Sequence, residues 1–226
     1  MTFFNRLCTE TETEKQRFLN RDIIQKALTE GVSVELYRAY LEQAYHHVKF
    51  TCPLLGLSLA KTPVSDRFYR AALINYIDEE KGHEEWILDD IETLGGDKEN
   101  VRHGEPNIPN KAMIGYLHYA IEYISPYAIL GMVHVLEGIS VDLAHKVASS
   151  IGQNIGKDAS GKGFSYLRSH GALDIEHVAF FEKTVNQITS IETQDIIIEN
   201  IKMIYRLWGD MFEEIDTSTQ GERYAA

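Results

Sequence analysis

The sequence predicts an all-α fold, and three observations support this prediction. Apolar residues recur with helical spacing along most of the 226 residues. No segment shows the alternating pattern and hairpin turns of a β-sheet. Proline is scarce, with five in the chain, and four of them (Pro63, Pro106, Pro109 and Pro126) fall at expected helix breaks. We expect a single helical domain over residues 1–226, with its core at about 15–215.

The first half of the chain predicts three helices. Residues 23–28 carry a short apolar stripe that ends at Gly31. Residues 34–60 follow as one long helix, which Pro53 is expected to kink because proline lacks a backbone donor. Residues 65–94 form a second long helix, with a serine at its start and two glycines after its end.

The second half of the chain predicts four more helices, over residues 111–125, 126–151, 164–190 and 192–215. Residues 95–110 before them are expected to form a long loop, of the kind that serves as a lid or binding loop. Pro126 suits the first turn of a helix, where its missing N–H is not needed. Residues 152–163 are rich in Gly and Lys and are expected to form a turn, and the polar residues 216–226 are expected to fray.

Charge and composition disfavour several classes of function. The formal net charge of -12 disfavours a nucleic-acid or anionic-membrane partner, because phosphate contacts need Lys or Arg. The chain has only two cysteines, Cys8 and Cys52, so no disulfide framework is expected. The first residues lack a basic run followed by an apolar stretch, and no apolar run approaches the ~20 residues of a membrane span. We therefore expect a cytoplasmic protein that acts on a small molecule.

The most specific motif is His170-x3-Asp174-x2-His177. At about 100° per residue in an α-helix, these three side chains share one face. Two imidazoles and a carboxylate on one stripe can form half of a metal site, whereas a polar helix face or hydrogen-bonded core histidines are the structural alternatives. Leu173 and Phe180 are apolar neighbours, which favours a position near the core over a solvated face.

A second motif lies in the acidic segment 78–85. Glu80 and His83 have the E-x-x-H spacing that is found in helical di-iron proteins. Glu79 lies four residues before His83 and is the alternative to Glu80 as a ligand. Taken alone, this pattern is more often an exposed acidic helix surface than a metal site.

The third candidate is Glu137, which lies in a strongly apolar segment, residues 132–139. A carboxylate in such surroundings is costly to bury unless it is paired or bound to a metal. A metal ligand is one interpretation, and an acceptor of a hydrogen bond from another helix is the other.

Together the three motifs supply three carboxylates and three imidazoles from three helices. Mixed nitrogen and oxygen ligands suit iron or manganese, and the three motifs contain no cysteine, which disfavours a structural zinc site. Two divalent ions would bring four positive charges, which three carboxylates would partly offset. The six candidate ligands are Glu80, His83, Glu137, His170, Asp174 and His177.

The same residues carry a family resemblance. The segment 45–49 (YHHVK), followed by PLL at 53–55, resembles the TenA and PqqC group of heme-oxygenase-like proteins. Residues 78–86 and the helix from His170 to His177 resemble the iron-containing branch of that fold, the heme-oxygenase-like di-iron oxidases and oxygenases. The resemblance covers roughly residues 15–212.

The resemblance implies a bundle of about seven helices around a central cavity, with two iron ions at the six candidate positions. It implies a non-heme oxidase or oxygenase that activates O2 and oxidises a small organic substrate. Known members act on fatty acids, amino acids and arginine-like compounds, and neither fold nor metal site fixes the choice. A homodimer is also expected, because relatives often form dimers. The apolar stripe Ile201, Ile204, Tyr205 and Trp208 would serve either a dimer interface or the core.

Two alternatives stay open: a cofactor-free TenA- or PqqC-like enzyme acting on thiamin-related compounds or a quinone precursor, and a non-catalytic binding protein. Some TenA relatives use a cysteine, for which Cys52 would be the candidate, although an inert buried thiol is the commoner case. Heme oxygenase would need an N-terminal axial histidine, and the first 40 residues contain none. The candidates for the substrate pocket are Tyr45, Phe164 and Tyr166, although aromatic residues more often pack in the core.

Overall fold

The computed structural model describes the backbone of residues 1–158 and 160–225, and the side chains of these residues except 142, 170–175 and 218–225. The described chain contains eleven α-helices, one π-helix, one 3-10 helix and no strand, so the predicted all-α class is confirmed and the expected count of seven helices is wrong. The elements are α1 (Phe3–Leu19), α2 (Asp22–Thr29), α3 (Val34–Val48), α4 (Thr51–Lys61), α5 (Arg67–Glu80), α6 (His83–Thr93), α7 (Lys98–His103), α8 (Ile108–Tyr119), η1 (Ala120–Ile124), η2 (Pro126–Ala128), α9 (Ile129–Ile155), α10 (Ser165–Val185) and α11 (Ile191–Ala225).

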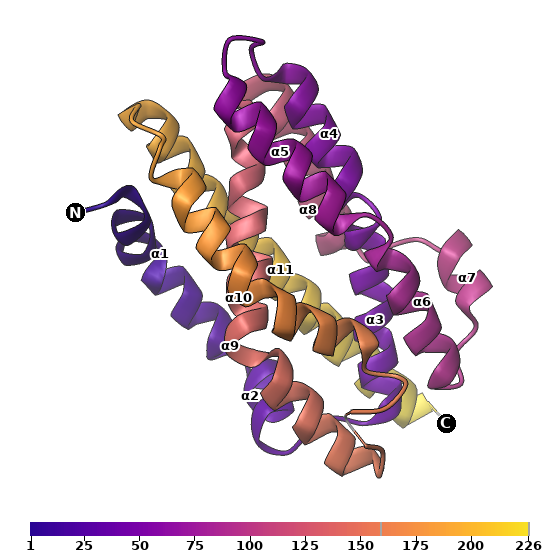
Figure 1. The fold of residues 1–226 in the computed structure, drawn as a ribbon. Helices are drawn as coiled ribbons and strands as arrows, with labels where there is room; N and C mark the ends of the chain where they lie inside the picture. The colour runs from indigo at the N-terminus through magenta and orange to yellow at the C-terminus, as the bar shows by residue number, and fades with distance from the viewer. Residues whose placement is uncertain (159, 226) are drawn as a thin grey trace.

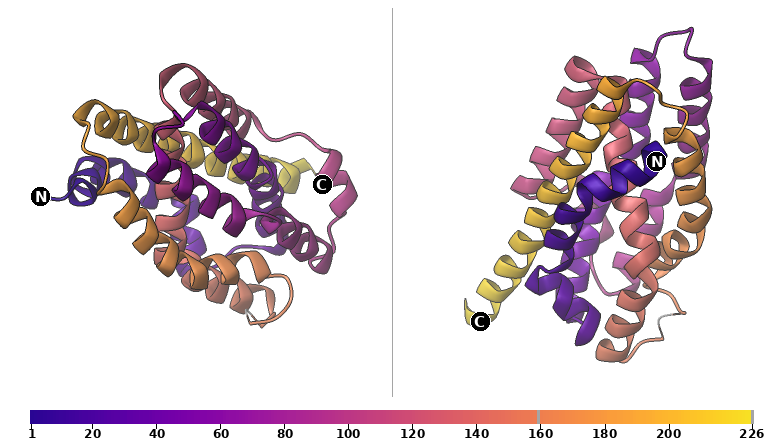
Figure 2. Two further views of the ribbon diagram at one scale, coloured as in Figure 1. Left: turned by 45° about the horizontal axis from the view of Figure 1, so that its top comes forward. Right: turned by 90° about the vertical axis from the view of Figure 1, so that its left-hand side faces the viewer.

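Helix α9 is the central element of the bundle. It packs chiefly against α10 and α11, and α2 covers its C-terminal half (Figures 1 and 2). The N-terminal half of α9 is mostly apolar and buried, which suits this position, whereas its C-terminal half also carries exposed polar residues such as His145 and Lys146. At Gly131 a Cβ atom would lie 2.8 Å from the Asn200 Cβ atom, so the backbones of α9 and α11 touch there. Glycine is required at this crossing by close approach rather than by its torsion angles.

Both long helices predicted in the first half are broken, which corrects the sequence prediction. The predicted helix 34–60 divides between Val48 and Thr51, and Pro53 lies in the first turn of α4, where its missing donor is tolerated. The predicted helix 65–94 divides at Gly82, whose φ of 86° is left-handed. Apolar periodicity continues across both breaks, so the pattern alone does not reveal them.

Three further segments differ from the prediction. The expected loop 95–110 contains α7, which Asp97 caps by accepting hydrogen bonds from the Glu99 and Asn100 amides. Helix α1 lies in a region for which the sequence predicted no element. Helix α11 continues to Ala225, past the end expected at residue 215.

The apolar stripe of α11 packs inside the chain. Ile201, Ile204, Tyr205 and Trp208 are all buried, so they serve the core, and the expected homodimer stays a prediction. Within the described residues no single helix is long and apolar enough to cross a membrane. Two consecutive helical segments, Pro126–Val141 and Leu143–Ile155, are bent by 52° relative to each other. Taken together they meet that test, by length and composition only.

Candidate metal centre

Three buried ionisable side chains from three helices converge at one point. Glu80 ends α5, Glu137 lies on α9 and His177 lies on α10, and they are 9%, 7% and 6% exposed. Each offers a ligand atom within 4.8 Å of the other two. The His177 Nδ1 atom lies 3.8 Å from Glu137 Oε1. Two carboxylates and an imidazole are suitable ligands for a divalent ion such as iron, and a bound cation would offset the cost of burying both acids.

Two more candidate ligands lie against this cluster. The His83 Nδ1 atom is 3.2 Å from Glu80 Oε2, and the side chain of His83 is buried. The Glu79 Oε2 atom is 3.4 Å from His177 Nε2, but the Glu79 side chain is 39% exposed. Glu80 therefore belongs to the buried cluster, while Glu79 approaches the outer edge of His177.

The E-x-x-H pair does not lie on one continuous helix. Glu80 is the last residue of α5 and His83 is the first residue of α6, with Lys81 and Gly82 forming the turn between them. The left-handed conformation of Gly82 reverses the local backbone and allows the two side chains to meet across the turn. The spacing predicted by sequence brings the residues together, although by a different local structure.

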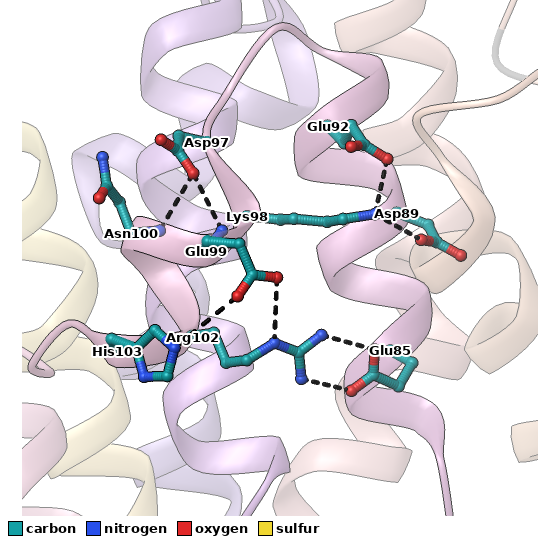
Figure 3. Close-up of polar contacts among 9 residues, drawn as sticks. All are labelled: Glu85, Asp89, Glu92, Asp97, Lys98, Glu99, Asn100, Arg102 and His103. Atoms are coloured by element: carbon teal, nitrogen blue, oxygen red, sulfur yellow. Dashed lines mark hydrogen bonds and ion pairs between the residues drawn. The ribbon is translucent and has the colours of Figure 1, made fainter.

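The first turn of α6 is held by contacts on two sides. The ring of His83 stacks on that of Trp86, with centroids 4.2 Å apart, which fixes the plane of the imidazole. Figure 3 shows α7 beside α6, where the Arg102 guanidinium donates to both carboxylate oxygens of Glu85 at 2.8 and 3.0 Å. These hydrogen bonds lower the pKa of Glu85. Lys98 adds an ion pair with Glu92 at 2.7 Å (Figure 3).

The remaining two candidate ligands, His170 and Asp174, have side chains outside the described residues. Their helix, α10, runs without interruption from Ser165 to Val185 and carries His177. The assignment of His170 and Asp174 to the site therefore stays a prediction from their spacing.

Asp90 fixes the start of α10 and was missed by the sequence reasoning. Its carboxylate is 1% exposed and accepts hydrogen bonds from the Gly163 amide at 3.1 Å and the Tyr166 amide at 2.8 Å. The Tyr37 hydroxyl donates to the Gly163 carbonyl at 3.1 Å and holds the same segment. Asp90 stands beside Asp89 in a helix rich in acidic residues, so the sequence does not distinguish this buried acid from its exposed neighbour.

A cavity with a volume of about 140 Å³ is lined by Glu80, Glu137 and a mainly apolar set of residues. Of the three predicted pocket residues, Tyr166 lines this cavity, whereas Tyr45 and Phe164 are buried elsewhere. Phe164 stacks on Tyr37, with ring centroids 5.3 Å apart, and Lys49 lies over the Tyr45 ring.

Tyr76 lines the cavity one helical turn before Glu80, and the sequence reasoning did not select it. Its side chain is 1% exposed, and its ring meets that of Phe180 edge-on. Burial, and then the nearby Glu137 carboxylate, raise the pKa of the Tyr76 hydroxyl. The phenol therefore keeps its proton at neutral pH and can donate a hydrogen bond.

Cys52 is half-buried, and its Sγ atom lies 3.8 Å from the carbonyl of Ile77. Burial raises the pKa of the Cys52 thiol, and the charges of Glu80 and Glu84 raise it further. A catalytic cysteine needs the opposite shift, so this thiol is not activated as a nucleophile.

Solved structures share this fold at low sequence identity. A domain of unknown function with a heme oxygenase-like fold from Shewanella denitrificans superposes with a TM-score of 0.89 at 20% identity, covering 99% of this chain and 96% of that one. A TenA homolog from Pseudomonas syringae pv. tomato has a TM-score of 0.79 at 15% identity over 95% and 93% of the two chains. Heme oxygenase-1 from the cyanobacterium Synechocystis, in complex with heme, has a TM-score of 0.74 at 12% identity over 100% and 99%.

The fold is thus heme oxygenase-like, and these identities establish nothing beyond the fold. No curated protein shows significant sequence similarity to the chain. A narrower assignment comes from residues 38–209, which match the sequence profile of one family and include all six candidate ligands. This chain belongs to the iron-containing redox enzyme family.

Proposed function

We propose that this protein is a non-heme oxidase or oxygenase that holds two iron ions and uses O2 to oxidise a small organic substrate. The observation that carries the proposal is the convergence of Glu80, Glu137 and His177 in a buried site at the wall of an apolar cavity. Membership of the iron-containing redox enzyme family supports the choice of metal. The net charge of -12 supports the further proposal that no nucleic acid is bound.

The positions of the donor atoms indicate how the six candidate ligands would divide between two ions. Glu80, Glu137 and His177 would hold one ion, and His83 with the α10 residues His170 and Asp174 would complete the site for a second. When bound, iron would supply the electrons that reduce O2. The same oxygen and nitrogen donors would also accept manganese.

The surrounding side chains would orient the ligands and control protons and water. Stacking on Trp86 restricts rotation of the His83 imidazole, and the Glu80 carboxylate contacts the same ring. The protonated hydroxyl of Tyr76 lines the cavity near the carboxylates and can donate a hydrogen bond to a polar substrate group there. The burial of Glu80 and Glu137 limits access of bulk water to the site.

The cofactor-free alternative has the TenA-like fold in its favour. In its cysteine-dependent form it would need an activated thiol, and the raised pKa of Cys52 disfavours that role. It also gives no reason to bury two glutamates beside a histidine. The iron-dependent function therefore explains more of the described site.

The decisive experiment is reconstitution of the full chain with Fe(II) under anaerobic conditions, followed by metal analysis and exposure to O2 with optical monitoring. We expect about two irons per chain and an absorbance change on oxygenation. His177→Ala and Glu137→Gln should each reduce the retained iron severely, as should His170→Ala and Asp174→Ala, while the helical circular dichroism persists.

Glu176→Gln is the matched control, since Glu176 is the exposed neighbour of His177 on the same helix. Its iron content should equal that of the unmodified chain. Unchanged iron in the ligand variants would refute the assignment. Failure of the unmodified chain to retain iron would favour the cofactor-free alternative, and thiamin-type ligands would then be tested.

A further inference from the structure

The imidazole of His177 lies between two carboxylates. Its Nδ1 atom is 3.8 Å from Oε1 of Glu137, and its Nε2 atom is 3.4 Å from Oε2 of Glu79. The two acids differ in their surroundings, because the Glu137 side chain is 9% exposed and the Glu79 side chain is 39% exposed. One edge of the ring therefore faces the buried cluster, and the opposite edge faces a carboxylate that reaches solvent.

Glu79 and Glu80 are adjacent at the end of α5, yet they contact different parts of the site. Successive residues of an α-helix point about 100° apart, so neighbouring side chains diverge. Glu80 turns into the buried cluster, whereas Glu79 extends along its outer edge to His177. The two acids compete for one role in the sequence motif, but the structure gives each of them a contact of its own.

A metal ion could reach His177 from either edge of the ring, and the donors at the two edges differ. At the Nδ1 edge the ion would lie near two buried carboxylates, Glu80 and Glu137, whose charges it would offset. At the Nε2 edge it would lie near Glu79, whose charge is already partly solvated. Burial of a carboxylate without a compensating charge is far more costly than exposure of one, so the Nδ1 edge is favoured.

His83 has the same orientation relative to the cluster. Its Nδ1 atom lies 3.2 Å from Oε2 of Glu80, so both described candidate histidines turn this nitrogen toward a buried acid. Stacking on Trp86 holds the His83 ring, whereas His177 has a carboxylate at its outer edge. The outer torsion of a histidine side chain is only loosely restrained, so such a contact is needed to keep one nitrogen inward.

We infer that His177 binds the metal through Nδ1 and donates its Nε2 proton to Glu79, which makes Glu79 a positioning residue and not a ligand. The inference rests on the proposed function only for the presence of a metal ion at the cluster. A neutral imidazole carries one proton, so binding through Nδ1 places that proton on Nε2. A carboxylate that accepts this proton in a hydrogen bond fixes the tautomer and the plane of the ring.

The contact between His177 and Glu79 is long at 3.4 Å. A bound cation would draw electron density from the ring and make its N–H a stronger donor, so metal binding should shorten this contact. Loss of the acceptor would release the ring and weaken metal binding without removing a ligand atom.

Zinc tests the tautomer without any oxygen chemistry, because Zn(II) is redox-inactive and accepts the same nitrogen and oxygen donors. Full-length protein labelled with 15N in its nine histidines would be loaded with Zn(II). Two-bond proton–nitrogen correlation NMR then distinguishes protonated from metal-bound ring nitrogens. We expect a metal-bound Nδ1 and a protonated Nε2 in His177. Binding through Nε2 would overturn the inference and leave the proposed function intact.

Two substitutions at Glu79 separate orientation from charge. Glu79→Ala removes the acceptor and should weaken Zn(II) binding by about tenfold or more, while the urea midpoint of the metal-free protein changes little. Glu79→Gln keeps an acceptor oxygen in the same place without the charge, so its affinity should stay within about threefold of that of the unmodified chain. Equal losses in the two variants would show that Glu79 acts by charge alone and would refute the positioning role.

Asp78→Ala is the matched control. Asp78 precedes Glu79 on α5, is 74% exposed and pairs with Lys81, so the substitution removes the same charge without a contact to His177. Its Zn(II) affinity should stay within about twofold of that of the unmodified chain, and a loss as large as that of Glu79→Ala would contradict the inference. If the NMR and the variants behave as expected but iron-loaded protein does not react with O2, the positioning role stands and the proposed function fails.

Discussion

The candidate metal centre draws its proposed ligands from two regions that are built differently. Glu137 and His177 project from the interior of the helices α9 and α10, where hydrogen bonds on both sides fix the backbone. Glu80 and His83 flank a two-residue turn in which one glycine, Gly82, adopts a left-handed conformation. The packing of α9 against α10 brings the first pair together, whereas the second pair depends on a single backbone conformation and on the packing of α6. The turn should therefore be the more easily disturbed half of the site.

The largest loss of stability is expected where Asp90 of α6 accepts hydrogen bonds from the start of α10. Asp90→Ala removes a buried carboxylate that accepts hydrogen bonds from two backbone amides. The free energy of unfolding, measured by urea denaturation, should therefore fall by about 3 kcal/mol. Asp89→Ala is the control, because the Asp89 side chain is 72% exposed and its contact with Lys98 is long at 3.9 Å. Similar losses for both variants would show that Asp90 does not hold these two regions together.

The turn itself can be tested with two glycines. A Cβ atom at either Gly82 or Gly156 would meet no atom within 4 Å, and both have positive φ, at 86° and 67°. Replacement by alanine should therefore cost about 1 kcal/mol of unfolding free energy at each position, from backbone strain alone.

Only Gly82→Ala should also weaken iron binding, by about tenfold, because Gly82 lies between Glu80 and His83. Gly156 ends α9 outside the site and acts as the control for stability. Equal iron affinity in the two variants would mean that the turn tolerates change as well as the helices do.

Helix α9 should respond to pH through His134. Burial lowers the pKa of His134 to about 4, and its ring lies 5.3 Å from that of Phe181. The unfolded chain binds this proton more readily, so stability is fully present above about pH 6.5 and is lost as the pH falls toward 4. His134→Phe should reduce that loss by about 2 kcal/mol at pH 5. Parallel stability curves for the two proteins between pH 7 and 5 would contradict this assignment.

The smallest effect is expected at the surface beside the turn. Arg102→Gln breaks the paired hydrogen bonds between α7 and Glu85 (Figure 3), but these side chains are partly exposed. We expect a loss of about 0.5 kcal/mol that disappears in high salt. Iron affinity should stay within twofold, because Trp86 still holds His83. A tenfold loss of iron would show that α7 helps to position the ligand.

Sequence reasoning succeeded where a helix is continuous and failed where it breaks. Periodicity predicted the four helices α8 to α11 with ends that differ by up to six residues, apart from the longer extension of α11, yet it joined α3 to α4 and α5 to α6. The same apolar face continues on both sides of Gly82, so only the backbone conformation marks the interruption. A single glycine within a helical pattern is a weak signal, since helices tolerate it at modest cost.

The prediction of site residues from the sequence has a similar limit, because it depends on burial that the sequence does not show. Glu137 was selected because an acid among apolar residues requires a compensating contact, and the structure places it beside Glu80 and His177. The choice between Glu79 and Glu80 needed their relative burial, which adjacent positions in a sequence do not reveal. Tyr76 resembles any core aromatic residue until the cavity is seen.

The short helix α2 has a consequence for the speed of ligand exchange. Its residues Ile23, Ile24 and Ala27 line the cavity, and Arg21, just before it, pairs with Asp210 of α11 at 2.9 Å. At Gly131, by contrast, the backbones of α9 and α11 are in contact, which leaves no room for movement there. With eight residues, α2 is the shortest of the described α-helices that line the cavity, so we expect it to open locally at the lowest cost in free energy. The residence time of a ligand is then expected to follow the opening rate of α2 and not the strength of the bonds at the metal, as amide hydrogen exchange in α2 would report.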